Sequence, residues 1–357
     1  MPAKNYLCAL FIALSFMGGH LFGQDPSTVP LQQSGPCGCC CESSCSCGCD
    51  EKHACDCGSD GVINIAPPVT QINPQHCPFS ESDCEFAKRC GLWGVWLPEC
   101  PVLFRPLLAD PRQIDYSVGW RFNDQVLGKN IIDISFGDTL AIYRWNDINI
   151  GPFCGQLQLE LEGALWATFA PLRDSSPLID ADYYVGFPIT YAFDRWQVRL
   201  RGYHVSTHMG DEFLIDNPYF YRRNPSAEFV DFFISNDFTD EIRYYAGIGL
   251  IVHQDETFKT GRVFLEFGSE VRLRQMGFTD FRNQLYGEPY YAMNFRIRKD
   301  FKHHLDQTYV IGYEIGKLYG LCRKLRFYLQ YHDGYSLDGQ FQKCATNYLS
   351  VRFSYGF

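Results

Sequence analysis

A histidine and a serine two residues apart, His204 and Ser206, are the side chains of this sequence best suited to covalent chemistry. On a β-strand alternate side chains point to the same face, so these two would be neighbours. Such a pair can act as general base and nucleophile when a third polar group orients the imidazole. Asp211, Glu212 and Glu228 are the candidates for that group. The spacing therefore predicts acyl transfer, in which Ser206 attacks an ester carbonyl and His204 accepts its proton.

Two other interpretations of these residues stay open. His204 and Ser206 can instead form part of a polar girdle where a strand leaves a membrane, in contact with lipid headgroups or water. A metal site made of His204 and His208 is a weaker alternative, because residues four apart on a strand are separated by about 13 Å.

The segment that carries His204 alternates as a membrane-spanning strand does. Gln197, Arg199 and Arg201 share one phase, which predicts a polar lumen face, while Trp196 and His204 share the other. With a rise of about 3.3 Å per residue and a tilt of about 40°, His204 would stand roughly 20 Å above Trp196. We therefore expect the His–Ser pair on the lipid face, near the outer rim.

The C-terminal segment, residues 347–357, alternates strictly and stops at an aromatic residue, Phe357. One face carries large apolar side chains and the other carries Ser, Arg and Gly. Outer-membrane barrels end in this way, and the segment resembles the signal that their assembly machinery reads. It predicts an outer-membrane location.

The composition fits a barrel whose lumen is polar and whose outer wall is apolar. The chain of 357 residues has a mean hydropathy of −0.19 and 20% charged residues, yet 16% of its residues are aromatic. It has no run of the roughly 18 apolar residues that a spanning helix needs. The net charge of −10 argues against nucleic acid as a partner.

Alternating segments separated by Gly, Asp, Asn and Pro predict an all-β fold over residues 101–357, a transmembrane antiparallel β-barrel. Thirteen segments fit: residues 115–122, 131–137, 139–146, 155–169, 181–193, 195–206, 227–235, 241–254, 261–272, 289–299, 307–318, 324–334 and 345–357. Bacterial barrels have even strand counts. We therefore drop the first segment and predict about twelve strands.

Two stretches do not fit this scheme simply. The connection over residues 274–288 is too long for a turn on its side of the barrel. Residues 86–112, with two tryptophans and several prolines, precede the barrel as a periplasmic collar or as an inserted plug, and the sequence does not decide between them. Asp110 and Arg112 are expected to pair at the periplasmic mouth.

The first 23 residues predict a signal peptide, because Lys4 precedes a short apolar run that ends in small residues near Gly23. Residues 24–100 follow as a disordered, cysteine-rich periplasmic extension. Nine cysteines fall between Cys37 and Cys57, in a stretch almost without large apolar side chains. Disulfides within and between chains are the first interpretation. Binding of zinc or copper(I), and a redox sensor, are the alternatives.

Three resemblances add expectations. The cysteine pattern is similar to that of the cysteine-rich envelope proteins of chlamydia-like bacteria, which implies disulfide-linked partners of that kind. His-x-Ser on an outward face resembles outer-membrane phospholipases and lipid A deacylases. That resemblance implies His204 as base, Ser206 as nucleophile, Asp211 or Glu212 as orienting acid, and possible use of calcium. Thr207 departs from it, because those families have Asn after the serine.

The third resemblance covers roughly residues 100–357. The blocks at residues 108–112 (LADPR), 203–212 (YHxSxHxGDE) and 224–228 (NPSxE) look like an uncharacterised bacterial family, a domain of unknown function whose members are expected to be exported barrels. It implies no activity.

We therefore expect a structural or pore-forming outer-membrane barrel, with lipid acyl-ester hydrolysis as the alternative function. Charged side chains expected in the lumen bear on whether the barrel is structural or forms a pore. They are Arg199, Arg201, Glu266, Glu270, Arg296 and Arg298. If they pair closely, the lumen is shut, and if they face water, they line a pore. Outer-membrane lipids and other cysteine-rich envelope proteins are the expected partners, and no cofactor is expected outside the hydrolase alternative.

Overall fold

The computed structural model describes residues 94–98, 102–282, 284–298, 305–318 and 322–357. The chain divides into two compact units, Met1–Pro68 and Val69–Phe357, and the described residues all belong to the second. The predicted signal peptide and almost all of the predicted cysteine-rich extension lie outside the described residues.

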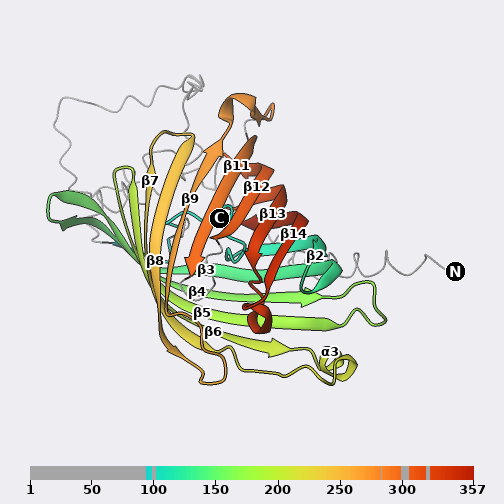
Figure 1. Ribbon diagram of the computed structural model, residues 1–357. Coiled ribbons are helices and arrows are strands. Elements are labelled where there is room, and N and C mark those ends of the chain that lie inside the picture. The colour runs from blue at the N-terminus through green and yellow to red at the C-terminus, as the bar shows by residue number, and fades with distance from the viewer. Residues whose placement is uncertain (1–93, 99–101, 283, 299–304, 319–321) are drawn as a thin grey trace, which may run out of the picture. The chain divides into compact units, whose positions relative to one another are not determined.

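The described chain forms a closed antiparallel β-barrel of twelve strands (Figure 1). The barrel strands are β2 (Tyr116–Asp124), β3 (Gly128–Ile150), β4 (Phe153–Phe169), β5 (Leu178–Phe193), β6 (Trp196–Met209), β7 (Ala227–Asp237), β8 (Ile242–Gln254), β9 (Val263–Arg272), β11 (Leu285–Arg298), β12 (Leu305–Lys317), β13 (Lys324–Tyr335) and β14 (Ala345–Gly356). Closure comes from β3, which pairs with β2 on one side and with β4 on the other.

The predicted number of strands is confirmed, but the predictions for three of the segments were wrong. The discarded segment 115–122 is strand β2, and the separate segments 131–137 and 139–146 are one strand, β3. Gly137 and Asp138 suggested a turn, yet both pair with β4 inside the ladder. A Cβ on Gly137 would lie 2.8 Å from the Cβ of Ala164, so the glycine is there for close packing.

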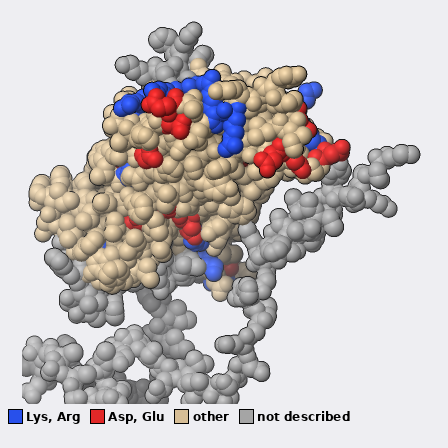
Figure 2. All heavy atoms as spheres, turned by 90° about the horizontal axis from the view of Figure 1, so that it is seen from below, with Lys and Arg blue, Asp and Glu red and all other residues tan. Residues whose placement is uncertain are grey.

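The alternation of side chains separates a polar interior from an apolar exterior. On β13 the outward Leu325 and Phe327 are exposed, whereas Arg326 is buried in the lumen. β14 repeats the pattern with Phe353 outside and Arg352 inside. Figure 2 shows a broad outer surface almost free of charged side chains, with Lys, Arg, Asp and Glu along its edges. Among the described residues, no helix is long and apolar enough to cross a membrane.

Residues 102–115 run inside the barrel as a plug. Phe104 and Leu107 are buried against Phe233 of β7 and Tyr245 of β8. The backbone NH of Leu108 donates to Glu270 Oε1 at 3.0 Å, and Arg243 donates to the carbonyl oxygens of Arg105 and Pro106, each at 2.9 Å. The choice between collar and plug is thereby decided for residues 102–112.

Short elements account for the remaining connections. The long connection that ends at β11 contains a 3-10 turn, η1 (Arg274–Met276), and a short strand, β10 (Phe278–Thr279), which pairs with β11. Strand β1 (Gly94–Trp96) pairs with β3, α3 (Asp211–Asp216) follows β6, and η2 (Gly339–Phe341) lies between β13 and β14. We call the barrel end where β14 finishes the C-terminal rim, and the other end, which carries α3 and η2, the opposite rim.

Candidate functional site

His204 and Ser206 lie on the outer face of β6, near the opposite rim. Their neighbours in sequence, Tyr203, Val205 and Thr207, take the inward phase, and Thr207 is fully buried. Antiparallel pairing places Glu228 of β7 directly across from His204. The predicted outward face of the His–Ser pair therefore agrees with the structure.

One carboxylate holds the imidazole of His204. Glu228 Oε1 lies 3.0 Å from His204 Nδ1, and Glu228 Oε2 lies 2.6 Å from Nδ1 of His253 on β8. Engagement of Nδ1 fixes the orientation of the His204 ring and leaves Nε2 for a second partner. Ser206 lies two residues further along the same face, about 6.6 Å away along the strand. A catalytic triad would need the hydroxyl of Ser206 to reach Nε2 of His204.

Asp211 and Glu212, the acids favoured from the sequence, lie in α3 and are exposed. Glu212 Oε2 accepts a hydrogen bond from Ser175 Oγ at 2.7 Å, in the loop between β4 and β5. The acid that contacts His204 is Glu228. This contact depends on the β6–β7 register, which no local pattern in the sequence reveals because a long connection joins the two strands.

His208 has a different environment from His204. Its ring contacts Tyr183 of β5 edge to face, with 5.3 Å between the ring centroids. Within the described ranges, no cluster of three or more His, Cys, Asp or Glu side chains is suited to hold a metal ion.

The lumen charges face one another at close range. Arg201 lies 2.7 Å from Asp231, Arg243 lies 3.3 Å from Glu270, and Arg352 lies 2.5 Å from Asp133. Glu314 of β12 is fully buried and accepts from three cations; these are Arg272, Lys324 and Arg326, at 3.1, 2.7 and 3.1 Å. Buried charges persist when they are paired and hydrogen-bonded, and this network pairs them between strands that are adjacent or separated by one strand.

The plug carries its own charges across the lumen to the opposite rim. The guanidinium of Arg112 lies 2.5 Å from Asp182 of β5 and 3.4 Å from Asp338, which precedes η2. Only the backbone NH of Arg112 contacts Asp110, at 2.9 Å. The expected pairing of Asp110 with Arg112 at the C-terminal rim was therefore wrong, because buried acids at the opposite rim take the guanidinium.

The chain belongs to the class of closed antiparallel β-barrels. Its twelve strands surround a charged interior filled by a plug, and its outer wall is apolar. A family model, "Protein of unknown function (DUF1207)", matches residues 64–357. The chain belongs to this family. The expectation that the chain belongs to an uncharacterised family is therefore confirmed.

Solved structures of similar fold are distant in sequence. Outer membrane phospholipase A from Escherichia coli is 12% identical, with a TM-score of 0.46, over 69% of this chain and 94% of that one. LpxR from Salmonella typhimurium is 9% identical, with a TM-score of 0.35, over 68% and 100%. The β domain of the Bordetella autotransporter BrkA is 8% identical, with a TM-score of 0.37, over 68% and 97%. No curated protein matches the chain.

Proposed function

We propose that this chain is an outer-membrane barrel with a structural role in the cell envelope, and that its lumen is closed. The apolar outer wall and the alternation of apolar and polar side chains along the barrel strands support the membrane location. The observation that carries the closed lumen is the plug, because residues 102–115 occupy the space that a pore would need.

The plug also suggests that the barrel serves as an anchor for the cysteine-rich segment. It directly follows the cysteine-rich segment in the sequence, so a plug fixed in the lumen would tether that segment at the C-terminal rim, in the periplasm. We propose that its cysteines form disulfides, some of them to other cysteine-rich envelope proteins. Non-reducing gels of envelopes should show high-mass species that collapse with reductant. A monomer with free thiols and bound zinc would contradict this.

A liposome-swelling assay tests the structural role against a porin. Proteoliposomes that contain the full chain should swell no faster in small sugars than empty liposomes do, because the lumen is filled. An open porin of known size in the same lipid is the control. Sugar entry at the porin's rate would overturn the structural proposal.

A second function, hydrolysis of acyl esters in outer-membrane lipids, is favoured by one contact, that of His204 with Glu228. His204 would take the proton of Ser206 as that hydroxyl attacks the ester carbonyl, and Glu228 would hold the ring. The outward face of the pair would bring it into contact with lipid.

The test of the second function is release of fatty acid from phospholipid and lipopolysaccharide by the purified barrel, with and without calcium. Ser206→Ala should abolish release while heat-modifiable migration stays normal. Ser175→Ala, an exposed serine on the same rim, is the matched control and should retain full release. Equal release by wild type and Ser206→Ala would leave only the structural role.

A further inference from the structure

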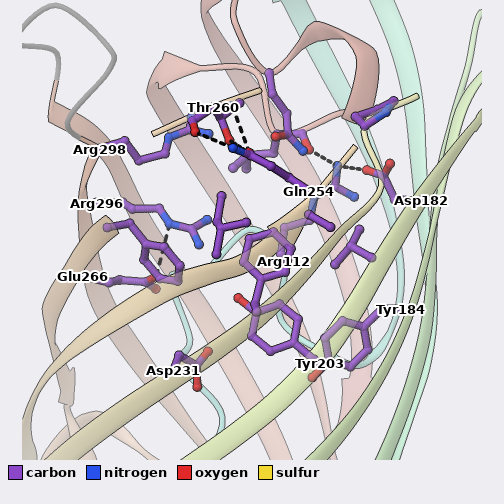
Figure 3. A pocket seen from close by; sticks show the side chains of 18 of the residues that line it. Arg112, Asp182, Tyr184, Tyr203, Asp231, Gln254, Thr260, Glu266, Arg296 and Arg298 are labelled. Atoms are coloured by element: carbon purple, nitrogen blue, oxygen red, sulfur yellow. Dashed lines mark hydrogen bonds and ion pairs between the residues drawn. The ribbon is translucent and has the colours of Figure 1, made fainter. Parts of the chain in front are cut away.

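A cavity of about 130 Å³ lies inside the barrel, between the plug and the loops of the opposite rim. Asp110, Arg112 and Ile114 of the plug line it, together with inward side chains of β5, β6, β7, β9 and β11. Figure 3 shows Arg296 and Arg298 on one side of it, and Tyr184 and Tyr203 on the other. Residues from all three sequence blocks, at 108–112, 203–212 and 224–228, meet at this cavity.

The guanidinium groups of the cavity are already paired. Arg112 lies 2.5 Å from Asp182, Arg201 lies 2.7 Å from Asp231, and Arg296 lies 3.6 Å from Glu266. Arg298 lies 3.0 Å from Asp306, outside the lining. An anionic ligand would have to displace a carboxylate from one of these pairs.

Asp110 differs from the other charged residues of the lining. Its Oδ1 accepts only the backbone NH of Arg112, at 2.9 Å. Among the described residues, no cationic side chain lies within ion-pair distance of its carboxylate. Asp110 therefore presents to the cavity a carboxylate that has no ion pair of its own.

Apolar and polar side chains share the other walls, and the apolar ones include Phe229, Ile251 and Phe258. Tyr203 stacks on Phe229 with 4.7 Å between ring centroids, and Ile251 and Phe258 are buried beside the cavity. The faces of Trp166 and Tyr203 already carry Arg112 and Arg201, so these rings offer apolar surface more than a free cation–π site. An apolar cavity of about 150 Å³ accommodates a benzene ring. This cavity, at about 130 Å³, therefore has room for an apolar body of at most about that size.

We propose that this cavity binds a small organic cation, a primary amine with an apolar body about as large as a benzene ring. Its ammonium group donates to Asp110, and its body packs against Phe229 and Phe258. This binding site is independent of the structural role, because the plug stays in place and forms part of the wall.

Calorimetric titration of the purified full-length barrel in detergent tests the proposal with three matched probes. Benzylamine, benzyl alcohol and benzoate share one ring and differ in charge. Benzylamine should bind saturably at one site, at least tenfold tighter than either of the other two. Equal affinity for the three probes, or tighter binding of benzoate, would overturn the proposal.

Two variants test whether the carboxylate of Asp110 binds the ammonium group. Asp110→Asn should weaken benzylamine binding at least tenfold and leave benzyl alcohol unchanged. Asp194→Asn, an exposed carboxylate in the β5–β6 turn at the C-terminal rim, is the control and should bind as wild type does. Heat-modifiable migration reports whether each variant is folded. A folded Asp110→Asn barrel with wild-type affinity would contradict the role of Asp110, and the wild-type selectivity stands as a test if that variant fails to fold.

Discussion

A single carboxylate, Glu228, determines the geometry of the outward polar cluster. It lies directly across from His204 on the neighbouring strand, and it also contacts His253. The contact with His253 holds the carboxylate in place, and the carboxylate in turn orients the imidazole of His204. The face of His204 and Ser206 followed directly from the alternation of the sequence. The identity of the orienting acid did not, because it depends on how β7 aligns with β6 after a connection of 17 residues, from 210 to 226.

If the cluster is catalytic, Glu228→Gln should lower the rate of lipid hydrolysis at least about 100-fold, because the neutral amide no longer stabilises the imidazolium. Glu212→Gln should change the rate less than about twofold, since Glu212 contacts Ser175. Initial rates of fatty-acid release measure both. The reverse order of the two effects would assign the orienting role to α3.

The ion pair between Asp338 and the plug residue Arg112 should make the stability of the barrel depend on pH. Burial opposes ionisation of its carboxyl, but Arg121 and Arg112 outweigh burial and hold its pKa below the usual value. A lowered folded-state pKa means that its stabilising contribution is complete above the unfolded pKa, about 3.9. That contribution is lost as the pH falls through the folded-state pKa.

We therefore expect the free energy of unfolding to decrease below about pH 4. The decrease should be smaller for Asp338→Asn, which is less stable at neutral pH but has lost this ionisation. Urea titrations of the barrel in lipid vesicles at several pH values measure it. Parallel pH profiles for the two proteins would show that Asp338 is not the group responsible.

At the scale of the strands, alternation predicted most of the barrel, and turn residues misled where packing was the stronger requirement. Gly137 and Asp138 are residue types typical of a turn, but strand β3, which is 23 residues long in total, continues through them. The even-count rule then removed a true strand, β2, so the correct total came from two compensating errors. Local sequence signals cannot separate a glycine that turns from a glycine that allows close approach.

Two glycines that neighbour one another across strands β3 and β4 test this explanation. Gly137→Val should lower the free energy of unfolding by about 1–3 kcal/mol, because its side chain would meet Ala164 and Ile114. Gly163→Val is the control and should cost much less, since a Cβ there meets nothing within 4 Å. Urea unfolding in vesicles compares them. Similar losses for both would mean that backbone freedom, and not space, explains Gly137.

For the whole molecule, the sequence could not decide what fills the barrel. Residues 102–115 have neither helical nor strand periodicity, and their contacts are distant in sequence, as between Leu108 and Glu270. The lumen charges alone fitted an open pore and a closed one equally well. Close pairing of those charges, together with the plug, is what distinguishes the two.

Single-channel conductance across a planar bilayer tests the closed lumen most directly. The wild-type barrel should show no stable conductance steps. A variant with residues 102–111 replaced by a Gly-Ser segment of equal length should show discrete openings, because Phe104, Leu107 and Leu108 no longer fill the lumen. Steady openings of the wild type, with the same unit conductance as this variant, would contradict the account.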